Sequence, residues 1–290
     1  MLGLEPLATL DLYLWLGHGV DVARLQHVNP STVSRQIRMA LKELNLRLVR
    51  CGAEREVHGD RELLQTLRHG LQLARLKGAA PLRIDGTYCS GPWFLREPPA
   101  GWIAGKGDLG GLRKPLQLLE DRVLDAWVGS YQPDLPDADD PRWLVIDLLR
   151  EPVQLLAAPD HPLAGVGRLR QSELERFPSL ALPSGWFPRT EAILRGQGLW
   201  RDPVELHRYD PDSWEGRCAD GVTLTYGQSL SEALQPGTVR LPWDLQLLTG
   251  EALVVRCDLA ERAAIQQLIS WLQGRAGAIA GQLEDVEVVG

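Results

Sequence analysis

The chain has 290 residues, of which 44% are hydrophobic and 24% charged. This length favours two or three compact units, and the composition is ordinary for a globular protein in water. No run approaches the ~20 apolar residues that cross a bilayer, and the N-terminus lacks the basic start and cleavage site of a secretory signal. Four cysteines lie far apart, without metal-ligand spacing. We therefore expect a cytoplasmic protein with no membrane partner, disulfide framework, metal or cofactor.

The net charge of −7 is unevenly distributed along the chain. Residues 1–78 carry 11 Lys/Arg against 8 Asp/Glu, a balance of +3, whereas residues 79–290 carry 20 against 30, a balance of −10. A basic N-terminal region followed by an acidic remainder indicates one module that lies near phosphates and another that does not. A balance of +3 is small enough to arise by chance.

The N-terminal region is predicted to form three short helices. Leucines at helical spacing predict the first over 5–16, and the second follows over 21–27. The third is predicted over 30–44, because Asn29 is a good N-cap and Pro30 suits the first helical position. A short helix, a tight turn and a longer helix are what a helix-turn-helix requires.

The third predicted helix is amphipathic. Its apolar stripe, which must pack inward, consists of Val33, Ile37, Ala40, Leu41 and Leu44. Its polar positions are Ser31, Thr32, Ser34, Arg35, Gln36, Arg38 and Lys42. Hydroxyls, an amide and cations without a carboxylate suit the major groove of DNA. A solvated basic face is an equally simple interpretation of the pattern.

Residues 50–58 are predicted to form a short hairpin or irregular segment, and a polar helix begins at Asp60. This helix has an apolar seam at Leu64, Leu67, Leu71 and Ala74. The spacing is that of a coiled coil about two heptads long, so we predict homodimerisation through residues 60–77. The alternative is a helix that packs on its own domain.

Beyond a linker at 77–81, short apolar runs alternate with helical stretches. The predicted strands are 82–84, 124–128, 153–157, 180–182, 204–207, 222–226 and 253–256, and the predicted helices include 188–195, 229–234 and 259–273. Such alternation predicts βαβ units and a mainly parallel sheet. About 190 residues are many for one sheet, so two similar α/β lobes fit better.

Several segments resemble those of one family. The run PSTVSRQI at 30–37, followed by KELNLRL at 42–48, resembles the recognition-helix region of LysR-type transcriptional regulators. EPVQLL at 151–156, followed by HPLA at 161–164, is similar to the family's crossover into its second lobe. The hairpin departs from the family pattern, since Cys51 stands where Arg is usual and Glu54 and Glu56 weaken its attraction for phosphate.

The resemblance implies an α+β multi-domain fold with a winged helix-turn-helix, a linker helix and a two-lobed effector domain like periplasmic binding proteins. The expected divisions are 1–58 for the DNA-binding domain, 59–78 for the linker and dimerisation helix, 81–274 for the effector-binding domain and 275–290 for a tail that need not be ordered. Within the effector domain, lobe I covers about 81–160 and 243–274, and lobe II about 161–242.

The expected function is a sequence-specific transcription regulator that is controlled by a small, anionic effector. The implied partners are double-stranded DNA, the effector and further copies of the chain, as a homodimer or homotetramer. The alternative is a LysR-like ligand-binding or interaction protein whose acidic wing has weakened or abolished DNA binding. No Gly-x-Ser-x-Gly, phosphate-binding loop, dinucleotide fingerprint or His-Glu-x-x-His occurs, so no enzyme is predicted.

In such a fold the ligand binds between the lobes, at the carboxyl ends of strands. The candidate effector-binding residues are Thr87, Tyr88, Ser90, Trp93, Arg189 and Thr225. Backbone N–H groups in the loop after the first strand favour an anion, and Arg189 is the predicted partner of that anion. Helix capping and ordinary surface exposure are the simpler interpretations of these residues.

Cys89 lies in the same loop, which raises the hypothesis of a thiol redox sensor with Cys218 as its resolving partner. Without a paired motif, a buried cysteine that acts as a small hydrophobic side chain is favoured.

Overall fold

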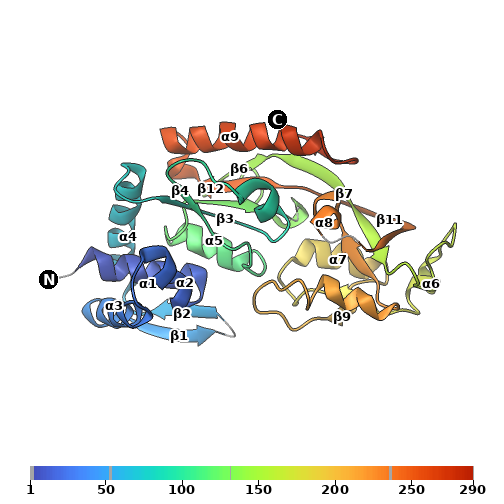
Figure 1. Cartoon of the computed structure of the whole chain (residues 1–290), viewed down its shortest axis with the longest axis horizontal. Coiled ribbons are helices and arrows are strands. Elements are labelled where there is room, and N and C mark those ends of the chain that lie inside the picture. Colours follow the sequence, from blue (N-terminus) through green and yellow to red (C-terminus); the bar gives the residue numbers. More distant parts are fainter. Residues whose placement is uncertain (1–2, 52–53, 131, 235–236, 290) are drawn as a thin grey trace.

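The structure is a computed structural model, which describes residues 3–51, 54–130, 132–234 and 237–289. A helical N-terminal unit lies at one end of the molecule, and two α/β units follow it (Figure 1). Among the helices of these residues, none combines the length and the apolar character that crossing a membrane demands.

The N-terminal unit has the predicted order of elements. It contains α1 (Leu4–Leu16), α2 (Gly19–Gln26), α3 (Pro30–Glu43) and an antiparallel hairpin, the wing, of β1 (Arg47–Cys51) and β2 (Glu54–His58). Pro30 occupies the first turn of α3, as predicted. The winged helix-turn-helix is therefore confirmed as a fold.

Helix α4 (Arg61–Leu76) packs on its own chain. Its buried residues are Leu64, Arg68, Gln72 and Arg75. Of the predicted seam only Leu64 is buried, while Leu67, Leu71 and Ala74 are half-buried. The most buried stripe thus faces the neighbouring lobe and is largely polar, which favours the alternative of a helix packed on its own domain. Dimerisation through α4 stays a prediction.

The unit that follows, lobe I, is built on a five-stranded sheet. Its strands lie in the order β4 (Trp102–Ala104), β3 (Leu82–Gly86), β5 (Ala126–Gly129), β12 (Ala252–Arg256) and β6 (Trp143–Asp147). Helix α5 (Arg113–Glu120) covers one face and α9 (Ala263–Ala280) the other (Figure 1). The short helical turns are η1 (Gly91–Leu95), η2 (Gln132–Asp134) and η4 (Cys257–Leu259).

Lobe II is built around β7 (Leu149–Ala157) and β11 (Val239–Thr249), the two long strands that run between the lobes (Figure 1). Its other elements are α6 (Gln171–Leu174), β8 (Leu180–Ala181), α7 (Pro188–Gly196), β9 (Asp202–Pro203), η3 (Glu215–Asp220), β10 (Thr225–Gly227) and α8 (Ser229–Leu234).

Several sequence predictions about these sheets were wrong. The lobe I sheet is mixed, because β12 is antiparallel to β5 and β6. In the main sheet of lobe II, β7 is antiparallel to both β10 and β11. The predicted strand at 204–207 is absent, since β9 ends at Pro203. Strands β4, β6 and β11 were not foreseen. The predicted tail, 275–290, contains the last turns of α9 and β13 (Glu287–Val288), which pairs with β7.

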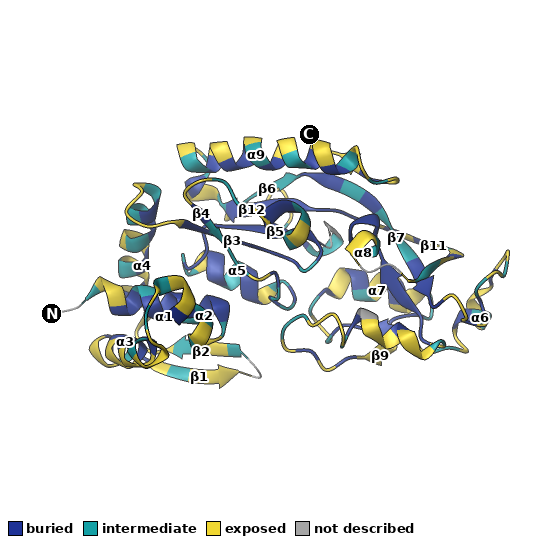
Figure 2. Ribbon diagram, in the orientation of Figure 1, coloured by how far each residue is buried: buried dark blue, intermediate teal, exposed yellow. Residues whose placement is uncertain are grey.

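The N-terminal unit and lobe I share one hydrophobic core, which joins α1–α4 to α5 and β5. Polar contacts cross the same interface. Trp15 Nε1 donates to Asp85 Oδ2 at 2.6 Å, and Arg75 donates to both carboxylate oxygens of Asp125 at 2.8 Å. Figure 2 shows that the facing sides of α1, α4 and α5 are buried. The N-terminal unit is therefore held on lobe I by packing and hydrogen bonds, not by the α4 connection alone.

Asp85 is a buried carboxyl group of this interface. Gly105, which follows strand β4, gives it room, because a Cβ there would lie 2.1 Å from Asp85 Oδ2. Burial raises the pKa of Asp85 to about 6, although the Trp15 indole and two backbone N–H groups favour its ionised form. Asp85 also stands two residues before Thr87, so the contact with α1 adjoins the predicted effector loop.

Candidate DNA-binding face and effector cleft

Helix α3 lies on the side of α1 that faces away from lobe I (Figure 1), with its outer face open (Figure 2). Of the predicted DNA-binding residues, those exposed are Ser31, Ser34, Arg35, Arg38 and Lys42, and Thr32 is half-buried. Ser34 and Arg38 make hydrogen bonds along the helix, to the carbonyl oxygens of Pro30 and Ser34. Five of the seven predicted residues thus share an accessible, cationic face.

Gln36 does not belong to that face. Its side chain is buried, its Nε2 donates to Glu5 Oε1 at 2.8 Å, and its Oε1 accepts from Thr9 Oγ1 at 2.8 Å. The sequence predicted that Gln36 flanks the exposed face, whereas it fastens α3 to α1. We correct that prediction: the amide satisfies buried polar groups inside the protein.

The acidic residues of the wing are paired with cations of the two lobes. Glu54 lies 3.1 Å from Arg208 Nε and 3.3 Å from Lys114 Nζ, and Glu56 lies 3.3 Å from Arg113 Nη2. Their charge is therefore compensated within the chain, which reduces the repulsion of phosphate that the sequence suggested.

The wing also gathers three potential metal ligands. Among the described residues, one donor atom each of Cys51, Glu56 and His58 lie within 4.8 Å of one another. The spacing of cysteines and histidines along the chain did not indicate this grouping, because the hairpin brings it about. Glu56 already pairs with Arg113, so the grouping has a structural explanation without a metal.

The predicted effector loop forms a buried polar network. The hydroxyl of Thr87 lies 2.5 Å from that of Ser130 and 2.9 Å from that of Ser90. Ser130 Oγ lies 2.8 Å from each carboxylate oxygen of Glu251, to which Gln228 Nε2 donates at 3.1 Å. The structure thus brings Thr87 and Ser90 together, but their hydroxyls are already engaged.

Sequence reasoning missed Ser130, Gln228 and Glu251. Ser130 had a usable signal, because it follows β5 as Thr87 follows the adjacent parallel strand β3. Gln228 and Glu251 arrive from the distant β10–α8 junction and the β11–β12 turn, so no local pattern points to them.

Two buried carboxyl groups lie at this junction of the lobes. Burial raises the pKa of Glu251 to about 7. Burial, and then the charge of Glu251, raises the pKa of Glu151 to about 8. Glu151 Oε1 is buried without a hydrogen-bond partner in the described part of the chain. This environment disfavours additional negative charge.

Arg189 does not face this network. Its guanidinium is exposed and pairs with Asp137 at 2.9 Å, and it also donates to the Pro133 carbonyl oxygen. The N-terminus of α7 instead binds Asp134 of lobe I, which accepts from Arg189 N at 2.6 Å, from Thr190 N at 2.9 Å and from Thr190 Oγ1 at 2.6 Å. The predicted anion site at this helix start is therefore filled by a carboxylate of the protein itself.

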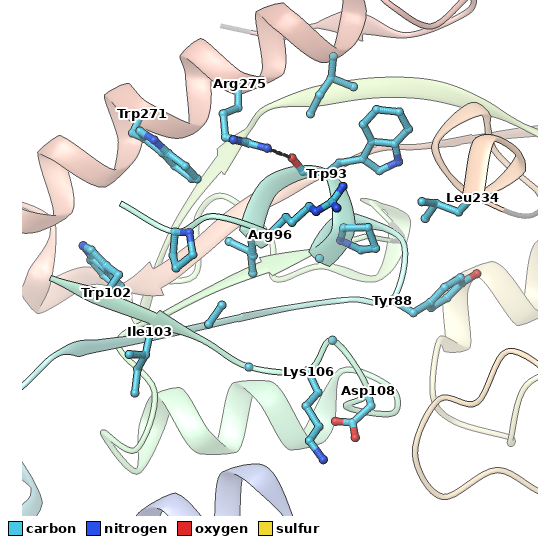
Figure 3. A pocket seen from close by; sticks show the side chains of 18 of the residues that line it. Tyr88, Trp93, Arg96, Trp102, Ile103, Lys106, Asp108, Leu234, Trp271 and Arg275 are labelled. Carbon is cyan, nitrogen blue, oxygen red and sulfur yellow. Dashed lines mark hydrogen bonds between the residues drawn. The ribbon is translucent and has the colours of Figure 1, made fainter. Parts of the chain in front are cut away.

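Trp93 and Thr225 also lie elsewhere than expected. Trp93 lines an open groove of about 1570 Å³ between η1, β4 and α9, where its carbonyl oxygen accepts from Arg275 (Figure 3). Thr225 is buried and lines a separate pocket of about 220 Å³ in lobe II. Trp93 shares its groove with Tyr88 and with Tyr209 of lobe II, whereas Thr225 lies away from both. An effector-binding role for either residue stays a prediction.

A small cavity of about 30 Å³ does lie between the lobes. Its lining comprises Tyr88, Pro133, Val153, Thr190, Leu194, Trp200, Trp214, Tyr226, Gly227, Gln228, Ser231, Leu247 and Thr249. Tyr88, a predicted effector residue, stacks on Tyr209 with ring centroids 3.5 Å apart. The cavity has room for only one or two waters, so the cleft is closed.

The redox hypothesis for Cys89 is not supported by its surroundings. Its Sγ lies 3.0 Å from Ser130 Oγ and 3.8 Å from Glu251 Oε1. Burial, followed by the negative charge of Glu251, raises the pKa of this thiol well above its usual value. A reactive sensor needs an accessible thiolate.

We expect a thiol-reactive maleimide at pH 7.5 to label Cys51 and Cys257 rapidly, because both are exposed. Cys89 should react only when the protein is unfolded, and peptide mapping by mass spectrometry distinguishes the sites. Rapid labelling of Cys89 in the folded protein would restore the sensor hypothesis.

Comparison with known proteins adds independent information. The family model of the LysR substrate binding domain matches residues 108–277, more than half of the chain. No curated protein matches the chain.

Three solved structures illustrate the structural likeness. A full-length OxyR variant from Pseudomonas aeruginosa has a TM-score of 0.56 at 17% identity, covering 94% of this chain and 95% of that one. CbnR complexed with its target DNA has a TM-score of 0.56 at 13% identity, with coverages of 94% and 99%. ArgP from Mycobacterium tuberculosis has a TM-score of 0.54 at 16% identity, with coverages of 95% and 98%.

At these identities the solved structures establish the fold, and the family model establishes the relationship. The fold class predicted from sequence is confirmed by both. The chain belongs to the LysR family of transcription regulators.

Proposed function

We propose that this chain binds duplex DNA in the cytoplasm through the exposed face of α3, and that a small molecule between the lobes controls this binding. The observation that carries the proposal is the chemistry of that face. Arg35 and Lys42 are exposed and have no ion-pair partner within the described ranges, and hydroxyls accompany them. Such a face can bind phosphates and base edges together.

The alternative of lost DNA binding depended on the acidic wing. Glu54 and Glu56 are held by Arg208, Lys114 and Arg113, so little free negative charge opposes an approaching phosphate backbone. This pairing supports the DNA-binding interpretation.

The contacts at the interface support control by the lobes. Arg208 of lobe II donates to the Trp15 carbonyl oxygen and pairs with Asp108 of lobe I and Glu54 of the wing. Any movement between the lobes would therefore change the contacts of Arg208 with α1 and with the wing.

The charge of the effector is revised within this proposal. The anionic effector predicted from sequence depended on backbone N–H groups of the loop after the first strand and on Arg189 as the partner of the anion, and Arg189 pairs with Asp137 at the surface. Two buried carboxyl groups, Glu151 and Glu251, lie at the junction of the lobes, and burial raises the pKa of both. An environment that disfavours their ionisation also disfavours a negatively charged ligand, so we favour an effector without negative charge.

Homodimerisation or tetramerisation remains part of the proposal. One flank of α4 carries Leu63, Leu67, Leu71 and Ala74 at helical spacing, exposed or half-buried in the single chain. A second copy would bury this flank, as a short coiled-coil seam does.

Arg35→Ala is the direct test of DNA binding. We expect about tenfold weaker binding to the promoter region upstream of the regulator's own gene, and a salt dependence whose slope falls by about 1, because one phosphate contact is lost. Fluorescence anisotropy at several salt concentrations measures both quantities.

Arg24→Ala is the matched control, because Arg24 is an exposed arginine of the same unit that lies on α2 and pairs with Asp21. It should leave affinity and slope nearly unchanged. Equal behaviour of the two variants, or no binding by the wild-type protein at low salt, would contradict the proposal.

A further inference from the structure

The cavity between the lobes is lined only by uncharged side chains, and four of these are aromatic: Tyr88, Trp200, Trp214 and Tyr226. Trp200 packs against Trp214 and Tyr226, with ring centroids 5.9 and 5.4 Å apart. Rigid aromatic walls from both lobes suit a flat, apolar molecule.

Two of these walls also carry unused hydrogen-bond donors. Trp200 and Trp214 are 2% and 1% exposed, and the indole Nε1 of each has no partner among the residues that the structure describes. A buried N–H without an acceptor is costly, and indole can only donate. An occupant that places an acceptor oxygen within reach of either donor would remove this cost.

The same lining excludes a charged occupant. A buried carboxylate needs a cation, and none of the thirteen lining residues supplies one. Gln228, which lines the cavity, also donates to Glu251, so a buried carboxyl group and not a cation stands behind this part of the wall. A neutral carbonyl can accept hydrogen bonds without the cost of burying an unpaired anion.

We propose that this cavity is the binding site of an uncharged, planar aromatic compound that bears a carbonyl oxygen. The inference deepens the proposed function, because it names the class of effector that the cleft accepts.

Binding requires the cavity to open. An aromatic ring needs a cavity of about 150 Å³, several times the space between the closed lobes. Pro133 and Thr190 line the cavity on opposite lobes, and Asp134 joins them by accepting from Thr190 N and Oγ1. Asp134 thus links the two lobes beside the cavity, and its hydrogen bonds to Thr190 break when the lobes separate.

Three naphthalene probes test the proposal in calorimetric titrations of the full chain without DNA. 1-Acetonaphthone carries a carbonyl group, 1-ethylnaphthalene lacks an acceptor, and 1-naphthoate carries a negative charge. We expect the ketone to bind at least fivefold more tightly than either of the others. Asp134→Ala should tighten ketone binding, because opening the cavity then no longer breaks the hydrogen bonds between Asp134 and Thr190.

Trp200→Phe and Trp214→Phe keep an aromatic wall and remove the donor, so each should weaken ketone binding at least threefold. Trp271→Phe is the matched control, because Trp271 lines the outer groove of Figure 3 and not this cavity. Tighter binding of the carboxylate, equal binding of ketone and hydrocarbon, or no ketone binding even to Asp134→Ala would overturn the proposal.

The ketone is then added to the DNA-binding assay. A change in DNA affinity on saturation supports both proposals. A ketone that binds in the cavity but leaves DNA affinity unchanged would contradict the proposed control of DNA binding and leave the site assignment intact.

Discussion

Asp11→Ala is expected to lower the free energy of unfolding by about 3–5 kcal/mol, the usual cost of removing one partner of a buried ion pair. Asp11 of α1 and Arg68 of α4 are each 1% exposed, and Arg68 Nε donates to Asp11 Oδ1 at 2.8 Å. Without Asp11, the one ion pair left to the guanidinium within the described part of the chain is the longer contact with Asp121, at 3.4 Å. Urea unfolding, followed by circular dichroism, measures the change.

Asp21→Ala is the matched control for Asp11→Ala. Asp21 also belongs to the N-terminal unit and pairs with Arg24 and Lys106, but both of these cations are well exposed. Exposed pairs contribute at most about 1 kcal/mol, so this variant should be nearly as stable as the wild type. Equal destabilisation by the two substitutions would show that the Asp11–Arg68 pair does not hold α1 to α4.

The second large effect is a gain in stability on mild acidification. The pKa values of Glu151, Glu251 and Asp85 are raised to about 8, 7 and 6, chiefly by burial. A raised pKa means that the folded state binds protons more tightly than the unfolded chain, so stability falls as pH rises through the folded-state value. Between pH 8.5 and 5.5 we therefore expect the free energy of unfolding to increase by several kcal/mol.

Glu151→Gln separates this effect from general charge repulsion. The amide oxygen can still accept from the backbone N–H of Leu230, but the buried charge is removed. The variant should be more stable than the wild type at pH 8.5 and should show a flatter pH profile. A profile as steep as that of the wild type would contradict the assignment of the raised pKa to Glu151.

The stabilisation has an acidic limit. The pKa values of other carboxylates, among them Asp21, Asp137 and Asp140, are lowered by hydrogen bonds to nearby cations. Such groups stabilise the fold above their unfolded pKa of about 3.8, and this contribution is lost as pH falls through their folded values. Maximum stability is therefore expected near pH 5.

Local patterns predicted the N-terminal unit well. The caps and spacings of 30–44 predicted α3 within one residue, because helix start signals act over a single turn. The accessible cations of α3 could also be predicted, since the opposite face of the helix is apolar. Gln36 could not, because its position depends on Glu5 and Thr9 of another helix.

Strand direction was harder to predict from the sequence. The prediction of a parallel sheet assumed that each strand returns through a helix, whereas β12 follows directly from β11, which returns from lobe II. That return reverses the direction of β12 beside β5. The same crossing brings Gln228 and Glu251 to Thr87, so the most important part of the cleft depends on contacts between distant segments.

The family resemblance, the helix-turn-helix and the cationic face of α3 could be predicted from the sequence, because these features depend on residues within a few turns of one another. The surroundings of the charged groups depend on the tertiary structure: Arg189 pairs with Asp137 at the surface, the α7 N-terminus binds Asp134, and Glu151 and Glu251 are buried. The physical reason is that the energy of a charge depends on its neighbours in space and on its distance from water, and neither is written in the order of residues.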